Sequence, residues 1–597
     1  MKRALCVFLA AACSLVLVGF CNADAAPLPA SSGQKRAADA LPESAALAEK
    51  NTAPSDEALV RVLDFLPSVR QALAYATADN FSDHPLYDFT DAYLRYGTVK
   101  KLQQVCEELA AQGLGLKIWD GFRPLGAQEE LNGLYPAFLS GEDLSDHNRG
   151  GAVDLTLVDL ETGEELPLPT GYNNFTAYAD RDYSDCSPEA AANAQLLEDV
   201  MKKHGFDPSS LRWWHFNDTQ EYPVAESFLP GIPTLWRSGK GSAELLRSPG
   251  GSHAASIGPG ETMELLGWEG KYALVRCGGR EGYVLSSDIL PASGDFSDCF
   301  CIVSPTACYS YEQLLADLKE FEERWPGDVT VDSIGLTELG QKIPVLRIGE
   351  QDAKYHVLLQ GAIHGREHAT AWLLMALADY WLDHGILNYG DICFHIIPMT
   401  NPDGVAISQT GELTESQQEI YQSDRQHYSA SSDQAEYTAR WKANGEGVDL
   451  NRNFPAGWEE IDGRSRPSSH LYEGDAPFSA AETAALRDYT LRYDFDVTVS
   501  YHATGSLLYA EYGGRQDVNA LSHSLGEAVS EVTSYPLTGN GESCAGYKDW
   551  AIDALGIPSL TIEVGCHSAP LAEEELASVF FRNLRVLPAI ARWLQRS

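Results

Sequence analysis

The chain has 597 residues, of which 44% are hydrophobic, so it is too long for one ordinary domain and can fill several cores. It carries 85 acidic and 43 basic residues, a formal net charge of -42. Such a charge repels nucleic acid and anionic lipid, which excludes a DNA-binding or RNA-binding role. The acidity does not identify a substrate, because solvated acidic surfaces are common.

Residues 1–25 have the pattern of a secretory signal peptide. Lys2 and Arg3 form a basic start, an apolar core runs from Ala4 to Phe20, and small residues close the segment at Ala23 to Ala25. The core is shorter than the ~20 apolar residues that a membrane span needs, so we expect cleavage and no stable span. We therefore expect a secreted or cell-envelope protein.

Cysteines near the start leave a lipid anchor open as an alternative. Cys13 lies early in the apolar core and Cys21 follows Phe20, and both positions fit lipid attachment poorly. The sequence has 12 cysteines, and cleavage would remove three of them (Cys6, Cys13 and Cys21), leaving nine. Nine cysteines cannot all pair internally, and their pairing does not follow from sequence.

Residues 26–55 are rich in Ala, Pro, Ser and charge without periodicity, which predicts a flexible linker. The next range, 56–231, is predicted to be a domain that mixes helices and strands. In it, His147 and Asp154 flank a glycine-rich turn that enters a strand, and His215 follows two tryptophans. A His, an Asp and a His at strand edges are a plausible zinc set.

This range resembles the D-alanyl-D-alanine dipeptidase family, whose S-x-H-x-x-G-x-A-x-D motif is met in full from Ser145 to Asp154. The resemblance implies an α+β fold, a zinc ion on the residues named above, and Arg123 of DGFRP as a substrate-orienting residue. The family places a catalytic Glu directly before the two tryptophans, where this chain has Arg212.

A guanidinium group cannot act as a base, so we expect this domain to bind zinc without hydrolysing D-Ala-D-Ala at a useful rate. Asp218 and Asp182 are the alternative bases that the sequence offers. An inert relic that merely folds is the competing interpretation.

Residues 235–293 change to short alternating runs separated by Gly and Pro, which predicts a small all-β barrel. The stretch resembles a bacterial SH3-like domain. Trp268, Tyr272 and Tyr283 either line a peptide groove or form the core of the barrel itself. The resemblance implies an accessory module that tethers the enzyme to peptide or cell wall, and a cysteine-bearing linker at 294–307 follows it.

The range 308–597 alternates helix-like and strand-like segments, which predicts an α/β domain with a mixed central sheet. The helix-like segments include 311–321, 369–381 and 480–492, and the strand-like ones include 343–349, 355–361 and 392–398. A polar insertion, Glu412 to Glu436, is predicted to form a loop at the rim of the site.

Four side chains that can bind a metal or transfer a proton follow strand-like runs in this range. The run Val357 to Leu359 leads into a turn with His364 and Glu367, which are three apart and therefore share a helical face. A catalytic zinc needs a third protein ligand, and His502 after the run VTVSY is the best candidate. Glu563 follows SLTI. Open α/β sheets place their sites at such carboxyl ends of strands.

The order H-x-x-E, D-x-N-R-N, strand-end His and strand-end Glu resembles the zinc carboxypeptidase family over roughly Tyr309 to Gln595. The resemblance implies one zinc ion on His364, Glu367 and His502. It also implies Glu563 as the general base that accepts a proton from the attacking water.

Three further roles follow from the same resemblance. Asn451 and Arg452 would hold a substrate carboxylate, because a guanidinium grips such a group bidentately. Asp449 would support a zinc histidine from behind. Lys548, just before Asp549 and Trp550, would line the pocket for the terminal side chain and favour a carboxylate there, unless it is simply exposed.

Two departures concern the stabilisation of the oxyanion. The tyrosine that the family has upstream of Asp-Trp is not found, and only Tyr547 is near. The arginine expected after Trp441 is Lys442, whereas Arg440 precedes the tryptophan. Either cation could supply the charge-assisted donor.

The leading hypothesis is an exported zinc peptidase of carboxypeptidase type that trims bacterial cell-wall stem peptides, at a bond beside D-Glu, diaminopimelate or a terminal D-Ala. The three adjacent resemblances motivate it. One alternative is a nutritional carboxypeptidase acting on ordinary peptides. Another is a wall-binding or peptide-sensing protein with both metal centres catalytically dead.

Overall fold

The computed structural model describes residues 52–596, except 78–79, 81, 83, 135–144, 226–227, 240 and 540–543. The predicted signal peptide and most of the predicted linker at 26–55 lie outside the described residues. Within the described part, no helix combines the length and the apolar character that crossing a membrane requires. Nine cysteines lie among the described residues, and the structure places none of them in a disulfide bond.

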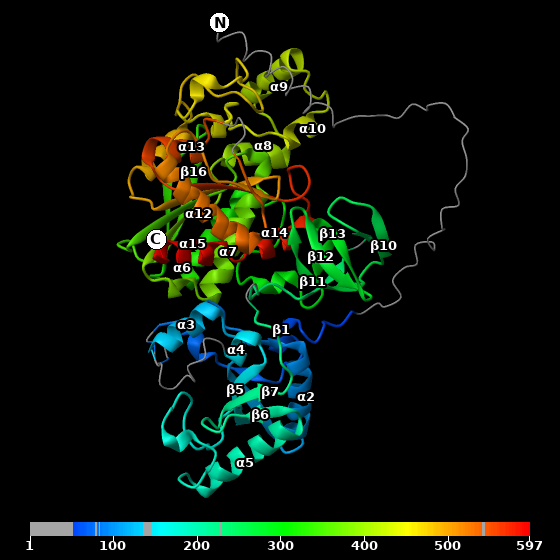
Figure 1. Ribbon diagram of the computed structural model, residues 1–597. Coiled ribbons are helices and arrows are strands. Elements are labelled where there is room, and N and C mark those ends of the chain that lie inside the picture. Colours follow the sequence, from blue (N-terminus) through cyan, green and yellow to red (C-terminus); the bar gives the residue numbers. More distant parts are fainter. Residues whose placement is uncertain are drawn as a thin grey trace, which may run out of the picture. The chain divides into compact units, whose positions relative to one another are not determined.

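A five-stranded mixed sheet forms the core of the N-terminal domain, in the order β2-β4-β5-β7-β6. Figure 1 labels three of its strands, β5, β6 and β7, together with helices α2 and α5. Helix α2 buries Leu102, Val105 and Leu109, whose three- and four-residue spacing gives it one apolar face. This mixture of helices with a largely antiparallel sheet confirms the predicted α+β character. The elements are β1 (Leu59–Arg61), β2 (Arg70–Gln71), β3 (Tyr93–Arg95), α2 (Tyr96–Ala110), β4 (Leu114–Asp120), α3 (Leu125–Leu134), α4 (Asp146–Arg149), β5 (Ala152–Asp159), α5 (Pro188–Lys203), β6 (Phe206–Pro208) and β7 (His215–Asp218).

The middle of the chain is a seven-stranded antiparallel sheet in the order β10-β9-β13-β12-β11-β8-β14. The order ends at β10 and β14, so the predicted SH3-like barrel is not confirmed, although the all-β content of this stretch agrees with the prediction. The strands are β8 (Leu235–Ser238), β9 (Ala243–Leu246), β10 (His253–Ile257), β11 (Thr262–Glu269), β12 (Tyr272–Cys277), β13 (Arg280–Leu285) and β14 (Ile289–Pro291).

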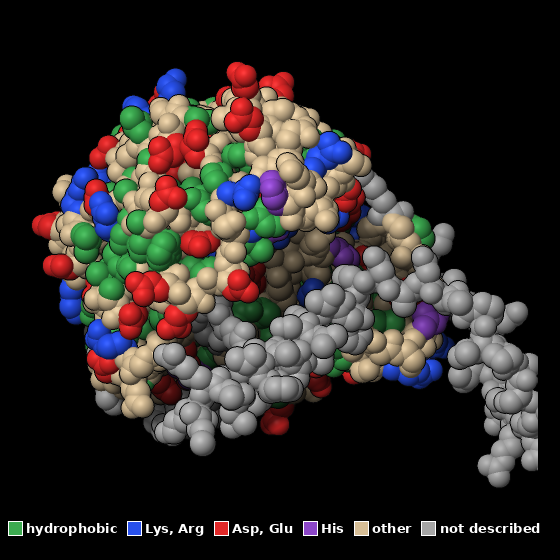
Figure 2. All heavy atoms as spheres, turned by 90° about the horizontal axis from the view of Figure 1, so that it is seen from above, with side chains coloured by type: hydrophobic (Ala, Val, Ile, Leu, Met, Phe, Trp, Pro, Cys, Tyr) green, Lys and Arg blue, Asp and Glu red, His purple; other side chains and the backbone are tan. Residues whose placement is uncertain are grey.

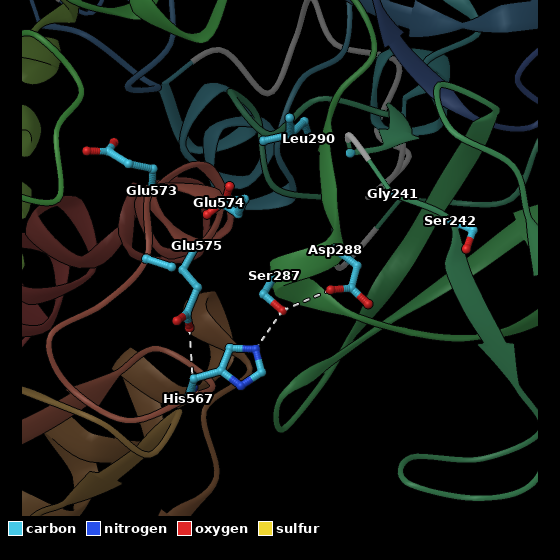
Figure 3. Close-up of a pocket in the computed structure, with 11 residues that line it drawn as sticks. Gly241, Ser242, Ser287, Asp288, Leu290, His567, Glu573, Glu574 and Glu575 are labelled. Carbon is cyan, nitrogen blue, oxygen red and sulfur yellow. Dashed lines mark hydrogen bonds between the residues drawn. The ribbon is translucent and has the colours of Figure 1, made fainter.

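Trp268, one of the three aromatic residues considered for a peptide groove, packs against this sheet's own core. Its ring lies edge-on to that of Trp236, with 5.5 Å between centroids, and 5.3 Å from the guanidinium of Arg582. A cavity of 460 Å³ is lined by Ser287, His567 and nine other residues, and Trp268, Tyr272 and Tyr283 are not among them (Figure 3). Trp268 therefore fits the core alternative better than the groove.

The C-terminal domain is built on an eight-stranded mixed sheet in the order β15-β16-β18-β17-β19-β22-β20-β21. Neighbouring strands β18, β17, β19 and β22 run parallel, which confirms the predicted mixed α/β sheet. The elements are α6 (Tyr311–Arg324), β15 (Val329–Leu336), β16 (Lys342–Ile348), β17 (Tyr355–Gln360), α7 (Ala369–His384), β18 (Ile392–Ile397), α8 (Pro402–Thr410), α11 (Ala481–Thr490), β19 (Val497–Ala503), β20 (Leu507–Tyr509), α12 (Gln516–Thr533), β21 (Leu537–Thr538), α13 (Tyr547–Trp550), β22 (Ser559–Val564), α14 (Leu576–Asn583) and α15 (Val586–Arg596).

The two faces of this sheet bury different residues of each strand. Val357 and Leu359 of β17 pack with α7, α12 and α14, whereas Leu358 packs on the opposite face with Leu486 and Tyr489 of α11. This alternation is the two-residue period of a strand buried on both faces. The sheet is therefore covered on both sides, which leaves the strand ends as the place for a site.

The prediction of a loop at 412–436 is wrong. The insertion forms helices α9 (Glu415–His427) and α10 (Gln434–Ala439). Thr414 caps α9: its hydroxyl accepts from the Gln417 amide, and the Gln417 side chain accepts from the Thr414 amide in return. Ile420 and Tyr421 of α9 are buried in a small hydrophobic core. The cap and this core, which also contains Ile407, Tyr437, Trp441 and Ala443, outweigh the overall polarity that favoured a loop.

Acidic side chains are spread over the face drawn in Figure 2, among basic and uncharged groups. This distribution agrees with the interpretation of the net charge of -42 as a solvated surface.

A buried carboxyl group on α11 makes the stability of the C-terminal domain depend on pH. Glu482 is fully buried and accepts a hydrogen bond from the Asn444 amide at 3.0 Å. Burial raises its pKa to about 7, and Asp403 adds to the effect. The folded state thus holds this proton more tightly than the unfolded state, whose glutamate pKa is ~4.3, so stability is lost as pH rises from there to about 7.

We expect Glu482→Gln to stabilise the protein increasingly between pH 5 and pH 8, by roughly 1–3 kcal/mol at the upper end, because the amide avoids burying a charge. Urea denaturation at both pH values measures the gain. Glu320→Gln, at an exposed position of α6, is the matched control and should change little. An equal effect of Glu482→Gln at both pH values would contradict the assignment.

Candidate metal centres and active site

His364 and Glu367 lie in a tight turn directly after β17. His364 is the N-cap of a short 3-10 helix, Gly365–Glu367, which turns the carboxylate back toward the imidazole. At Gly365 a Cβ atom would lie 2.3 Å from the carbonyl oxygen of Gly404, so only glycine fits this close approach. The parallel register of β19 and β22 places His502 directly opposite Glu563.

The carboxylate of Glu367 lies between the two histidines. Its Oε1 is 2.9 Å from His364 Nδ1 and its Oε2 is 3.0 Å from His502 Nδ1. All three side chains are buried, and their ligand atoms lie within 4.8 Å of one another. Burial alone would raise the pKa of Glu367, but the two histidines lower it well below its usual range. Two imidazole nitrogens and an ionised carboxylate fit zinc in type and number.

Asp449 lies behind His364, where the sequence analysis expected it. One carboxylate oxygen is 3.3 Å from His364 Nε2, and the other accepts from the Leu471 amide at 3.0 Å. The carboxylate therefore holds the far nitrogen and leaves Nδ1 facing Glu367. Arg452 Nε is 3.6 Å from the same Asp449 carboxylate.

Glu563 faces the same cavity as the three ligands and is half-buried. Burial raises its pKa to about 7, and Glu367 adds to the rise while His502, Lys442 and Arg366 oppose it. A carboxylate with a pKa near neutrality is well matched to accepting and returning a proton.

The cavity has a volume of 370 Å³ and brings together all the residues predicted for this site. Of the two candidate donors to the oxyanion, Lys442 lines this cavity. Arg440 is exposed and pairs with Glu436. The cavity is lined by His364, Arg366, Glu367, Lys442, Asp449, Asn451, Arg452, His502, Ala503, Thr504, Tyr509, Gly546, Lys548, Asp549, Thr561 and Glu563.

Four residues that line the cavity were not predicted from the sequence: Arg366, Thr504, Tyr509 and Thr561. Arg366 stands inside the H-x-x-E turn and could have been found from that position. Tyr509 ends β20, a strand of three residues that gives little sequence signal. Tyr547, the tyrosine near Asp-Trp that did not meet the family's position, is fully buried, and its hydroxyl contacts Thr490 at 3.0 Å.

Lys548 is buried at the wall of the cavity, so the alternative of an exposed lysine is wrong. Its ammonium donates to the Asp549 carboxylate at 2.7 Å and to the Glu511 carbonyl at 2.9 Å. Burial lowers the pKa of Lys548, and Asp549 opposes this. Asn451 Nδ2 is 3.5 Å from His502 Nε2, while its oxygen accepts from the Tyr547 amide.

The N-terminal domain contains the second predicted set. Asp154 Oδ1 is 2.7 Å from His215 Nδ1 and 3.4 Å from His147 Nε2. The Gly121 carbonyl accepts from His147 Nδ1 at 2.6 Å, which leaves Nε2 directed at Asp154. The three side chains are buried and their ligand atoms lie within 4.8 Å of one another. This donor set also fits zinc.

Arg123 and Arg212 lie beside this second set in different ways. Arg123 is buried, where its guanidinium donates to Asp120 and Gln128 and covers the ring of Tyr75 at 5.1 Å. Arg212 is half-buried. Burial lowers the pKa of His215 to about 4, and the positive charge of Arg212 contributes to the lowering against the pull of Asp154.

The two alternative bases for this centre are engaged elsewhere. Asp218 accepts from Lys101 and from the Thr98 hydroxyl at 2.7 Å. Asp182 accepts from the backbone amide of Ser184 at 2.8 Å and is exposed. Neither carboxylate therefore takes the place of a base beside His215.

Two known families match separate parts of the chain. Zinc carboxypeptidases match residues 314–582, and D-Ala-D-Ala dipeptidases match residues 140–231. Over 299 residues the chain is 29% identical to the gamma-D-glutamyl-L-diamino acid endopeptidase 1 of Lysinibacillus sphaericus, covering 47% of this chain and 72% of that protein.

Two further relatives divide in the same way. The D-alanyl-D-alanine dipeptidase of Enterococcus faecium is 32% identical over 176 residues, covering 26% of this chain and 87% of that protein. The carboxypeptidase B of Astacus astacus is 26% identical over 283 residues, covering 43% of this chain and 86% of that protein. The chain is therefore a zinc metallopeptidase that belongs to the zinc carboxypeptidase family through its C-terminal domain and to the D-alanyl-D-alanine dipeptidase family through its N-terminal domain.

Proposed function

We propose that the C-terminal domain hydrolyses bacterial cell-wall stem peptides and that the N-terminal domain binds zinc without efficient catalysis. The observation that carries the proposal is the cavity at His364, Glu367, His502 and Glu563, which also contains the buried cation Lys548. Complete ligand and base residues argue against a catalytically dead binding protein.

The residues of this cavity divide the work of peptide hydrolysis between them. His364, Glu367 and His502 would hold a zinc ion, which would supply a Lewis acid for the scissile carbonyl. Glu563 accepts a proton from the attacking water and returns it to the departing amine nitrogen. Lys442 is the candidate donor to the developing oxyanion.

Two cations give the substrate its orientation in this proposal. Arg452 and Asn451 hold a carboxylate of the substrate, as the family resemblance implies. Lys548 uses two of its three ammonium hydrogens on Asp549 and Glu511, so one donor is left for a second carboxylate.

Cell-wall stem peptides combine D-Glu and diamino-acid residues, so they carry several carboxylates near the scissile bond. The relative from Lysinibacillus sphaericus is named for cleavage between such residues, which supports this substrate class. The matched dipeptidase family and the predicted export of the chain favour the same setting, in the secreted or envelope compartment.

Side-by-side digestion of purified peptidoglycan fragments and casein peptides, read by mass spectrometry, tests the proposal. We expect cleavage of the stem peptides beside D-Glu or the diamino acid, with little release from casein. Efficient trimming of casein peptides alone would favour the nutritional carboxypeptidase, and binding without cleavage of either would favour a sensing protein.

Glu563→Gln keeps the size of the side chain and removes the base. We expect the zinc content to persist while turnover of stem peptides falls ~10²-fold or more. Glu574→Gln, at an exposed position, is the control and should keep both properties. Near-normal turnover in Glu563→Gln would mean that another group accepts the proton.

Lys548→Met is expected to lower the preference for substrates with an acidic terminal side chain over neutral ones. The ratio of the two kcat/KM values should fall ~10-fold or more, the equivalent of ~1.4 kcal/mol of lost pairing. Lys548→Arg keeps the charge and should keep most of the preference. An unchanged ratio in Lys548→Met would remove the residue from specificity.

The N-terminal centre is expected to gain D-Ala-D-Ala hydrolysis only when Arg212 becomes a base. The assay uses the full chain with Glu563→Gln, so that the other site contributes little. Arg212→Glu should raise the rate by ~10²-fold or more, and Arg212→Gln, which removes only the charge, should not. Robust hydrolysis with Arg212 in place would contradict the impaired centre.

A further inference from the structure

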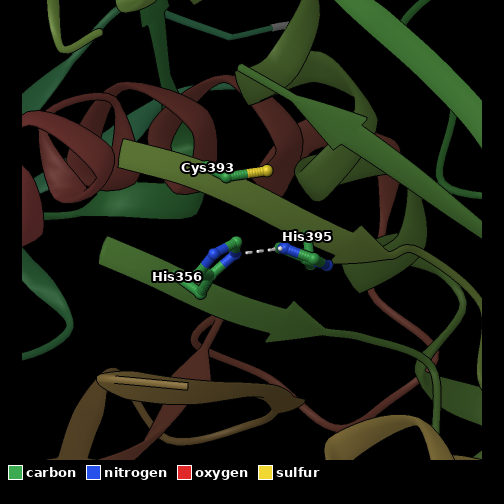
Figure 4. A group of neighbouring side chains, drawn as sticks. All are labelled: His356, Cys393 and His395. Atoms are coloured by element: carbon green, nitrogen blue, oxygen red, sulfur yellow. Dashed lines mark hydrogen bonds between the residues drawn. The ribbon is translucent and has the colours of Figure 1, made fainter. Parts of the chain in front are cut away.

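A third group of metal-type side chains lies at the opposite end of the central strands from the catalytic cavity. His356 is the second residue of β17, and Cys393 and His395 are the second and fourth residues of β18. The parallel register pairs His356 with Cys393, and His395 is two residues further along β18, so all three project from one face of the sheet. Figure 4 shows the two imidazoles and the thiol on these neighbouring strands.

The donor atoms of this group converge. His356 Nδ1 and His395 Nε2 are 3.0 Å apart, and the ligand atoms of all three residues lie within 4.8 Å of one another. Among the described residues, the Cys393 sulfur has one polar contact, a long one of 3.9 Å to the Gly349 carbonyl. Two nitrogens that face each other share at most one proton, so the pair can offer a lone pair to an ion.

A hydrogen bond from the opposite side orients one of the rings. His395 Nδ1 lies 2.7 Å from the Tyr489 hydroxyl of α11, which leaves Nε2 for the ion. A partner on the second ring nitrogen is the usual support of a metal-binding histidine. Tyr493 and Phe495 add aromatic walls around His395, with ring centroids 4.6 and 5.0 Å away.

We propose that His356, Cys393 and His395 form a third transition-metal site, which binds a zinc-type divalent ion through two imidazoles and one thiolate. Imidazole and thiolate are the ligands that zinc and copper select over harder cations such as Mg²⁺. Cys393 gives up its thiol proton to solvent when the ion binds, so each ion releases one proton.

The charges around the cluster make the sulfur the deciding ligand. Arg347 lies opposite His395 on β16, and its guanidinium donates to the Tyr493 hydroxyl at 3.0 Å. Its positive charge opposes an ion held only by neutral imidazoles and favours a thiolate. Cys393 and His395 are buried, whereas His356 is half-buried, so an ion would reach the site past His356.

The site is separate from the two families' metal centres, because it shares no residue with either of the other sets. An ion here would join β17 to β18 where the two strands begin. Its expected effect is therefore on the stability of the sheet, with no part in peptide hydrolysis.

Cobalt substitution tests this site selectively, because the other two sets contain no cysteine. The full chain is freed of metal, loaded with Co²⁺, and measured by absorption. We expect a thiolate-to-cobalt charge-transfer band in the wild type, lost in Cys393→Ser and in His356→Gln. Cys566→Ser changes another buried cysteine and should keep the band.

Retained stem-peptide hydrolysis in zinc-loaded Cys393→Ser would show that the variant is folded. His356→Gln changes a half-buried residue and gives a second variant if Cys393→Ser fails to fold. Absence of the band in fully cobalt-loaded wild type, or its persistence in both variants, would overturn the proposal. Loss of hydrolysis in Glu563→Gln with the band intact would support both proposals, because each site would then respond only to its own variant.

Discussion

The arrangement of the catalytic domain depends on one carboxylate, Glu367, held between the Nδ1 atoms of His364 and His502. Without a counter-ion a buried carboxylate is costly, so this group needs its two imidazoles or a metal cation. The parallel register of β17, β19 and β22 brings the three segments to one edge of the sheet. The Asp449 carboxylate contacts the second ring nitrogen of His364, and Glu563 lies on the neighbouring strand, β22. Strand pairing therefore places His502 and Glu563 opposite each other, and the turn after β17 adds His364 and Glu367.

The two metal centres match families that share a chemistry but place it on different sheets. Both sets use two histidines and one carboxylate, each buried and within 4.8 Å. They differ in what stands beside the set. Glu563 faces the C-terminal cavity, whereas Arg212 adds positive charge to the N-terminal one. We infer that binding and chemistry are separated in this chain: one centre hydrolyses, and the other retains the capacity to hold a metal and a ligand.

The sequence was sufficient for the parts of the site that short motifs specify. The H-x-x-E turn and the strand-end residues predicted His364, Glu367 and Glu563 correctly as neighbours. Residues that no motif marks and that meet through strand register were missed, because register is a property of the folded sheet. Tyr509 and the group of His356 with Cys393 are examples. The insertion at 412–436 misled through its polarity, since a cap at Thr414 and a few buried residues outweighed it.

The central claim is that a zinc ion sits between His364, Glu367 and His502 in a working active site. A crystal structure of the zinc-loaded protein with a stem-peptide fragment, with anomalous scattering recorded at the zinc edge, measures this directly. We expect an anomalous peak between the two Nδ1 atoms and the Glu367 carboxylate, with the scissile bond beside Glu563. A cavity with no peak in active crystals, or a peak on other side chains, would contradict it.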